Sequence, residues 1–337
     1  MDTNLNTISI ADMTDLLRRE FEMVGQHLPS VATALFQKDE RGLNSGEFAL
    51  YEEFDTDTFA SWKPQGTPTA KARAGVGYHK QAKVRRFGIE IDITDEMRKF
   101  NKKPEFISKA TNLVNYAPDR IELDLTHRLT FASATSYVDR DGNTIDLTVG
   151  DGLALASSAH TLKYSSTTWS NIVSGAPTFG RTGLEAAELL AVTNIYNNFG
   201  EKRKMNFNTL FYTDNPTTEN LVMELLQSTA SISSGINSGV KNVYQAKYKT
   251  IKLPYLATNA QGQYDVAKKG YWGICASGSD AGAWQAYFPV WESPYMVDPM
   301  TTPSLVDGHS DIWTYGTRTS YDVAIVSGRG FIISLAS

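Results

Sequence analysis

Cysteine is almost absent from this sequence. The one cysteine, Cys275, lies in the apolar run YWGICA, so no internal disulfide is possible and a buried, unreactive thiol is expected. Long hydrophobic runs are absent too, because no stretch approaches the roughly 18–20 apolar residues of a membrane-spanning helix. The start, MDTNLNTISI, has Asp2 where a secretory signal carries basic residues. We therefore expect synthesis inside the cell and no membrane partner.

An excess of positive charge is also lacking. The formal net charge is −5, which argues against a protein that binds nucleic acid over its whole surface through many Lys and Arg contacts. A local basic patch is still compatible with this charge. The 337 residues, 41% of them apolar, are enough to bury one large core or two smaller ones. These numbers predict a globular protein of about two domains.

Signatures of metal and cofactor binding are missing. The segment YVDRDGNTIDL places Gly142 too early for an EF-hand and has no closing glutamate. The glycines of GSDAGAW and SGRGF do not follow the patterns that cradle phosphate. The histidines lack zinc-like spacing to each other or to the cysteine; they are His27, His79, His127, His160 and His309. We expect no cofactor.

The segment DGLALASSAH raises the question of hydrolytic chemistry. A serine hydrolase would use Ser157 or Ser158 with His160, but it needs the serine on a strained strand-to-helix turn, typically G-x-S-x-G. That local pattern is absent here. Leu155 reads as a core position and Asp151–Gly152 as a turn, so the segment favours a structural role. We expect no enzyme, with the hydrolase kept as an alternative.

The first forty residues predict a helix. Ser9 and Asp12 form a capping-box pattern, and Pro29 is expected to interrupt the helix. One apolar stripe continues to Leu35 and packs either on its own domain or, as an arm, on a neighbouring subunit. Its first positions are Ile10, Met13, Leu17, Phe21, Val24 and Leu28.

Charge reverses sign within the next segment, residues 43–93. Acids come first: Glu47, Glu52, Glu53, Asp55 and Asp57. From Thr58 to Ile89 there is no acid. The same stretch contains seven bases: Lys63, Lys71, Arg73, Lys80, Lys83, Arg85 and Arg86. The middle is too poor in apolar residues to anchor itself in a core, so it predicts a projecting loop or two-stranded ribbon. RRFGIEIDIT alternates and predicts a strand that returns to the body. We expect the bases to meet acids of a neighbouring subunit, either its acidic segment from Glu47 to Asp57 or Glu122 and Asp124 of its long helix. The alternative is that these bases are solvated charges that keep an exposed loop soluble.

The remainder mixes helices and strands. Apolar residues from Ile107 to Ala132 share one helical face and predict the longest helix, which Pro118 kinks or restarts. A hairpin turning at Asp141–Gly142 follows. Thr182 and Glu185 predict the cap of a helix that stops at Gly200, and Asn215–Pro216 opens another helix. The chain ends in strands. The predicted fold class is α+β.

This order of elements resembles the major capsid proteins of tailed bacteriophages, the Hong Kong 97 fold. The closest local patterns are those of the Mu-like branch: DGLALASSAH after the long helix, a Ser/Thr-rich loop with an asparagine, a LEAA-type helix, LFYTDNPTTENLVMELL, and NVYQAKYKTIKLPYL as an axial strand pair. The resemblance covers the chain from about Glu47 to its end. It departs from the family in lacking an obvious charged N-terminal scaffold region, so either scaffolding is separate or the sequence is the mature form.

The resemblance implies a division of the chain. Residues 1–42 would be an N-terminal arm, 43–93 the extended loop, and 94–180 the spine helix with peripheral strands. Residues 181–290 would form the axial domain, and 291–337 would be C-terminal strands that complete the peripheral and axial sheets. In such proteins the Asp-Gly and His segment is a packed connection between the spine helix and the axial domain.

The resemblance also implies a function. The chain would be a major capsid protein that self-assembles into pentamers and hexamers of an icosahedral phage head around double-stranded DNA. It would be made in the host cytoplasm, reside in the virion, and meet a portal and scaffolding or decoration proteins. The nearest alternative is an encapsulin-like compartment shell. A third hypothesis is a soluble nucleic-acid-binding protein that uses Lys63 to Arg86.

Overall fold

The computed structural model describes residues 31–94, 103–229, 241–277, 284–298 and 312–336, with Asp12, Thr14, Asp15, Arg18, Arg19 and Glu22 before them. The helical elements are η1 (Ala32–Leu35), η2 (Leu43–Ser45), α3 (Lys103–Thr130), α4 (Arg181–Thr193), α5 (Pro216–Gln227) and η3 (Val266–Lys268). The strands are β1 (Gln37–Glu40), β2 (Phe48–Thr56), β3 (Ala74–Lys83), β4 (Arg85–Thr94), β5 (Ser136–Val138), β6 (Thr144–Asp146), β7 (Thr209–Thr213), β8 (Lys249–Leu253), β9 (Trp272–Cys275), β10 (Ala286–Val297), β11 (Ile312–Tyr321), β12 (Ala324–Ile325) and β13 (Phe331–Ser334). The predicted α+β class is confirmed.

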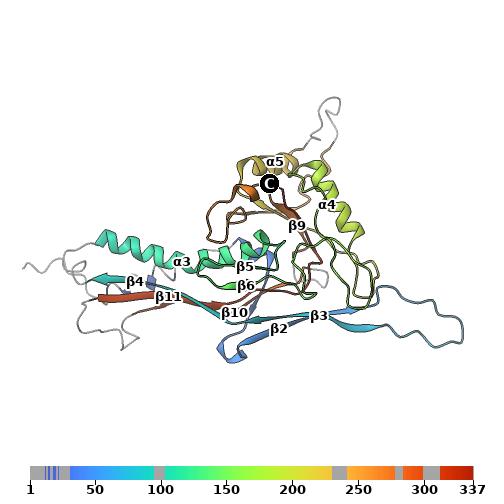
Figure 1. Ribbon diagram of the computed structural model, residues 1–337, viewed down its shortest axis with the longest axis horizontal. Coiled ribbons are helices and arrows are strands. Elements are labelled where there is room, and N and C mark those ends of the chain that lie inside the picture. The colour runs from blue at the N-terminus through green and yellow to red at the C-terminus, as the bar shows by residue number, and fades with distance from the viewer. Residues whose placement is uncertain are drawn as a thin grey trace, which may run out of the picture.

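A peripheral sheet forms the elongated half of the molecule (Figure 1). Its order is β1-β10-β11-β4, with β12 also paired to β10. Strand β4, the predicted RRFGIEIDIT strand, pairs antiparallel with β11 along its whole length, from Arg85↔Tyr321 to Thr94↔Ile312. The long helix α3 packs along β4 and β11. It runs through Pro118 without restarting, so of the two alternatives at this proline only a kink remains.

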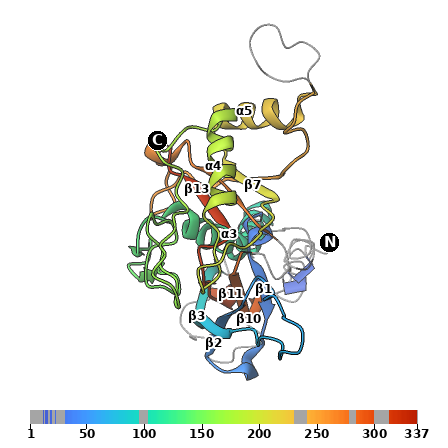
Figure 2. The same cartoon turned by 90° about the vertical axis from the view of Figure 1, so that its right-hand side faces the viewer.

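A second sheet, β13-β9-β7-β8, carries the helices α4 and α5. Together they form the part of the molecule that rises above the peripheral sheet in Figure 1, and Figure 2 shows α4, β7 and β13 from the side. The last strand, β13, returns to pair with β9. Helices α4 and α5 lie within residues 181–290, but the sheet also takes β13 from the end of the chain, and the expected axial domain stays a prediction.

Strand alternation gives the second sheet two buried faces. Phe211 and Ile333 point into a core shared with α3, while Leu210 and Ile274 point into a core shared with α4 and α5, because successive side chains of a strand face opposite sides. Cys275 lies in the first core, where burial raises the pKa of its thiol. The expectation of a buried cysteine is confirmed.

The capping residues read from the sequence predict the start of α5 correctly and the ends of α4 incorrectly. The Asn215 side chain accepts a hydrogen bond from the Thr217 amide and Pro216 opens the helix, as predicted. Helix α4 instead has Gly180 at its N-cap, without a side-chain capping bond, and ends at Thr193. The expected capping box and the stop at Gly200 are therefore wrong, because the backbone turns at Asn194.

The first forty residues are only partly described. The apolar stripe Ile10, Met13, Leu17, Phe21, Val24 and Leu28 lies outside the described residues. Thr14 and Arg18 are helical and contact Tyr315 and Asp298 of the same subunit, at 3.2 and 2.6 Å. The end of the apolar stripe, Ala32–Leu35, is a 3₁₀ turn packed on α3; the interruption expected at Pro29 lies outside the described residues. Strand β1 then joins the peripheral sheet, within the segment expected to be the arm.

The buried ring of His127 joins α3 to the segment that follows β8. Its Nε2 lies 3.0 Å from the Thr258 hydroxyl oxygen, and its ring meets Phe131 and Tyr137 edge-on. Burial, with the nearby charge of Lys268, lowers the pKa of His127 from 6.5 to about 4. The folded state therefore keeps this ring neutral at pH values where an unfolded chain protonates it.

We expect stability to fall as pH drops from about 6.5 to about 4. In this window the unfolded chain binds a proton at His127 and the folded chain does not, so protonation favours unfolding by up to about 3 kcal/mol. Urea unfolding of the unassembled subunit at pH 7 and pH 4.5 measures this loss. The variant His127→Gln should lose clearly less between the two pH values; an equal loss in both proteins contradicts the assignment.

Candidate assembly surface

The predicted projecting ribbon is present. Strands β2 and β3 pair antiparallel from Phe48↔Lys83 to Thr56↔Ala74, and residues 58–73 form an exposed tip. Figure 1 shows the ribbon extending from the body in the direction opposite to the long arm of α3, β4 and β11. The tip is too polar to form a core, so the ribbon depends on contacts at its base.

The two faces of β2 differ completely. Ala49, Glu53 and Asp55 lie on a buried inner face. Phe48, Leu50 and Phe54 alternate with them on an outer face that is 48–64% exposed, and the directly opposed Val76 of β3 is 42% exposed. We call these four apolar residues the outer face. A strand that leaves such residues in water presents a surface suited to another protein.

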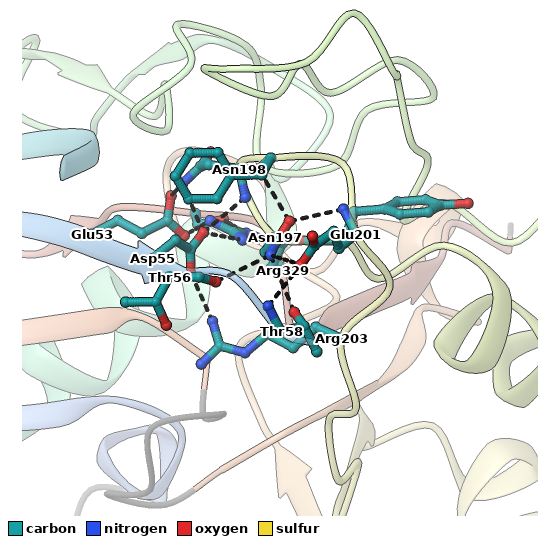
Figure 3. Close-up of polar contacts among 12 residues, drawn as sticks. Glu53, Asp55, Thr56, Thr58, Asn197, Asn198, Glu201, Arg203 and Arg329 are labelled. Atoms are coloured by element: carbon teal, nitrogen blue, oxygen red, sulfur yellow. Dashed lines mark hydrogen bonds and ion pairs between the residues drawn. The ribbon is translucent and has the colours of Figure 1, made fainter. Parts of the chain in front are cut away.

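A cluster of four charged side chains holds the base of the ribbon (Figure 3). Glu53 and Asp55 come from β2, Arg329 from the turn before β13, and Arg203 from the segment after α4. Arg329 pairs with Glu53 and, at 2.9 Å, with Asp55; Arg203 reaches Asp55 at 2.9 Å. Both carboxyl side chains are only 2% exposed. Two acids and two bases make the cluster formally neutral.

Asn198 completes the cluster and explains a nearby glycine. Its side-chain amide donates to Glu53 at 2.6 Å and to Asp55 at 2.8 Å, and its backbone amide donates to Asp55 at 2.9 Å. A Cβ on Gly77 of β3 would lie 2.4 Å from the Asn198 amide nitrogen and 2.6 Å from a Glu53 oxygen. Only glycine lets β3 pass this closely over the cluster.

These contacts correct the expected role of several charges. Glu53 and Asp55 were expected at an assembly interface, but they are buried inside their own subunit. The spine acids are occupied too: Glu122 accepts from the Ala32 amide at 3.0 Å, and Asp124 pairs with Arg120 at 3.1 Å. None of the four is accessible to the bases of a neighbour.

Several bases of the ribbon also have partners within the subunit. Arg73 pairs with Asp57 and Glu201, Lys80 with Asp146, and Arg85 with Asp322, at 2.6–3.2 Å. Arg86 is 3.7 Å from Glu292. The other charges expected at the interface are exposed, and for them an intersubunit role stays a prediction: Glu47, Glu52, Lys63, Lys71 and Lys83.

The hydrolase alternative is not supported by the geometry of the DGLALASSAH segment. His160 Nδ1 lies 2.8 Å from the Asp151 carboxylate, and Nε2 faces the Leu155 carbonyl oxygen at 3.1 Å. The Ser157 hydroxyl accepts from the Ala159 amide at 3.2 Å. Burial raises the pKa of Asp151, but the hydrogen bond and charge of His160 outweigh it and hold that pKa below its usual value. Both ring nitrogens of His160 thus have partners within the segment, and neither faces a serine hydroxyl.

In the described part of the chain, no group of three or more His, Cys, Asp or Glu side chains is placed to hold a metal ion. Among the described helices, none has both the length and the apolar character to cross a membrane.

Comparison with known proteins gives similarities of fold only. No family model and no curated protein matches this sequence. Among solved structures, the capsid of cyanophage P-SCSP1u is similar with a TM-score of 0.47 and 10% identity, over 90% of this chain and 86% of that chain. The cyanophage Pam1 capsid asymmetric unit gives 0.45 and 13%, over 89% and 87%, and a Mycobacterium phage Adephagia structure gives 0.46 and 8%, over 92% and 90%. Similarity at this level does not by itself assign a function.

The cluster was missed by sequence reasoning because its partners are distant in the chain. Arg329 is 274 residues from Asp55, and Arg203 is 148. One signal was present: Glu53 and Asp55 share a strand face with Ala49 and Tyr51, opposite to Phe48, Leu50 and Phe54. If that face packs inward, its acids are buried and need bases.

Removing Arg329 should release the ribbon. Arg329→Met leaves two buried carboxylates with too few cations, so we expect the unassembled subunit to lose about 3–5 kcal/mol. The control Arg318→Met breaks an exposed pair with Glu90 and should cost at most about 1 kcal/mol. Urea unfolding measures both. Adding Glu53→Gln to Arg329→Met should recover part of the loss; similar small losses in both single variants contradict the role of the cluster.

Charge reversal should separate paired from free bases. Arg85→Glu places a carboxylate beside Asp322 and near Asp124, so we expect the unassembled subunit to lose roughly 2 kcal/mol or more. The double variant Lys63→Glu/Lys71→Glu changes only exposed tip residues and should stay within about 0.5 kcal/mol of the parent. Thermal unfolding compares them, and an unchanged Arg85→Glu subunit would show that its ion pair is not formed.

Proposed function

We propose that this chain is the major capsid protein of a tailed bacteriophage, of the branch its sequence segments resemble. It would assemble through pentamers and hexamers into an icosahedral head that encloses double-stranded DNA. The observation that carries the proposal is the ribbon: a two-stranded projection fixed at its base by buried charges, with an apolar outer face that its own subunit does not cover. The resemblance of several segments to the Hong Kong 97 family is the reason for proposing an icosahedral shell as the assembly.

A projecting apolar surface favours closed assemblies. The ribbon leaves one side of the subunit, so a neighbour that receives it must do so with a different surface, and such contacts are heterologous. Repeated heterologous contacts that close produce rings, and rings joined by further contacts produce shells. Burying Phe48, Leu50 and Phe54 on a neighbour would contribute about 1.5–3 kcal/mol for each side chain that becomes fully buried.

Packaged DNA would be held without sequence-specific binding. The net charge of −5 does not favour a tight grip on phosphates, which lets DNA pack freely inside a shell. The portal, scaffolding and decoration proteins of the proposal follow from the family resemblance alone.

An encapsulin-like compartment is the second candidate, because the resemblance gives it the same fold. Such a shell would enclose protein cargo in place of nucleic acid. Purified particles that protect double-stranded DNA from nuclease favour the phage head. Particles that contain a co-purified enzyme and no DNA favour the compartment.

Variants of the outer face test the proposal. We expect the purified protein to form uniform closed shells by electron microscopy, and Leu50→Glu/Phe54→Glu to prevent them because charges replace the surface that a neighbour would bury. The matched control Leu50→Met/Phe54→Leu keeps that surface apolar and should still assemble.

The thermal stability of the unassembled double-glutamate variant should stay within about 0.5 kcal/mol of the parent, since both side chains are exposed. A parent protein that remains monomeric at every concentration and salt condition tested contradicts the proposed function.

A further inference from the structure

An open cavity of about 410 Å³ lies between the middle of α3, the start of β4 and the turn at 261–262. Phe87, Ile89, Tyr116, Leu123 and Tyr255 supply its apolar and aromatic wall. This volume is in the range of pockets that bury most of a small ligand. Two of the wall residues, Ile89 and Tyr116, are about 40% exposed, so the cavity offers apolar surface that the subunit does not cover.

The ribbon tip carries a side chain of the right kind for such a cavity. Trp62 is 86% exposed, whereas four other tryptophans are at most 5% exposed and Trp313 is half-buried. A tryptophan that becomes buried removes about 150–250 Å² of surface from water and is among the strongest anchors of protein interfaces. An indole ring held in solvent at the end of a projection is therefore an anchor without a pocket in its own subunit.

Trp62 and the cavity cannot meet within one subunit. The tip extends from one end of the long axis of the molecule, whereas α3 and β4 extend toward the other end (Figure 1). A projection and a pocket on separate surfaces of the same chain form the two halves of a heterologous contact. We propose that the α3–β4 cavity of one subunit receives Trp62 from the ribbon tip of a second copy of this chain.

The charges around the cavity match this occupant. Arg120, which lines the cavity, is paired with Asp124, Asp139 and Asp141. Asp119 also lines the cavity, and in the described part of the chain it has no hydrogen bond or ion pair. Burial raises the pKa of its carboxyl group, which is the effect of a charge that lacks a partner.

The tip brings a cation to this carboxylate. Lys63 directly follows Trp62, is exposed, and likewise has no ion pair among the described residues. With the indole in the cavity, its ammonium group lies within reach of Asp119 at the rim. Arg140 also lines the cavity. Its guanidinium is 3.8 Å from Asp141, beyond hydrogen-bond distance, and it offers a cation to the face of the indole ring.

This inference rests on the proposed function, because it names the receptor for a ribbon that must dock on a neighbour. It specifies one contact between subunits, in which Trp62 is the anchor and the α3–β4 cavity is its receptor. Assembly through the outer face alone, with the tip free in solvent, is the competing arrangement.

Crosslinking in assembled particles distinguishes the two. The variant Ser61→Cys/Gln261→Cys places one thiol beside Trp62 and another on the cavity rim, and both positions are exposed. A short bismaleimide should join them between subunits and give a ladder of covalent oligomers on a denaturing gel. The native Cys275 is fully buried and should not react, which the single-cysteine variants check.

Ser61→Cys/Val243→Cys is the matched control, because Val243 is 79% exposed and lies on the connection between α5 and β8, away from the cavity. Particles that form but give no ladder through Gln261, or an equal ladder through Val243, overturn the docking and leave the proposed function standing. Absence of particles from the parent chain overturns the proposed function itself.

A charge exchange gives a second readout. Lys63→Glu and Asp119→Lys should each raise the protein concentration needed for assembly several-fold, because each places like charges at the rim. The double variant Lys63→Glu/Asp119→Lys restores opposite charges and should return the concentration toward that of the parent. Additive losses in the double variant contradict the contact, since a merely structural effect of either change would not be rescued by the other.

Discussion

The buried pairing of Arg329 with Glu53 and Asp55 is the constraint on which the rest of the surface depends. It joins β2, near the start of the chain, to the turn before β13, near its end. Because charges so deeply buried are costly unless all are paired, the ribbon is fixed at its base in one arrangement. A ribbon held only by backbone hydrogen bonds to its partner strand would be marginally stable.

Fixing the inner face of β2 determines what its outer face can do. With Glu53 and Asp55 turned into the body, alternation forces Phe48, Leu50 and Phe54 outward. A shift of one residue in register would bury the aromatics and expose the acids, but it would also separate the acids from Arg329. The polar cluster therefore specifies an apolar surface that only another molecule can cover.

Much of the fold followed from the sequence, because its signals were local. The long helix, the hairpin at Asp141–Gly142, the cap at Asn215 and the strand RRFGIEIDIT were predicted from residues a few positions apart, and the structure confirms them. The end of α4 was predicted wrongly because the backbone turns at Asn194, where the sequence carries no strong stop signal.

The charges were harder to predict because they depend on long-range contacts. A base in a polar loop reads as free in the sequence, yet Arg85 meets Asp322 and Arg73 meets Glu201, partners more than a hundred residues away. The projecting ribbon itself was predictable, since a long segment poor in apolar residues cannot pack. The sequence could not predict which charges of the ribbon stay available to a neighbouring subunit. Each ion pair formed within the subunit makes one of these charges unavailable.

Buried groups fix the fold of the subunit and exposed groups are left for contacts between subunits, an arrangement that suits a subunit that folds before it assembles. The ion pairs that set the ribbon direction lie inside one chain, so they form without a neighbour. The groups left in solvent, such as Trp62 and Phe54, are apolar or singly charged and gain stability only on contact. Individual contacts of this kind are weak, which allows misplaced subunits to leave, while their repetition around a closed shell makes the finished assembly stable.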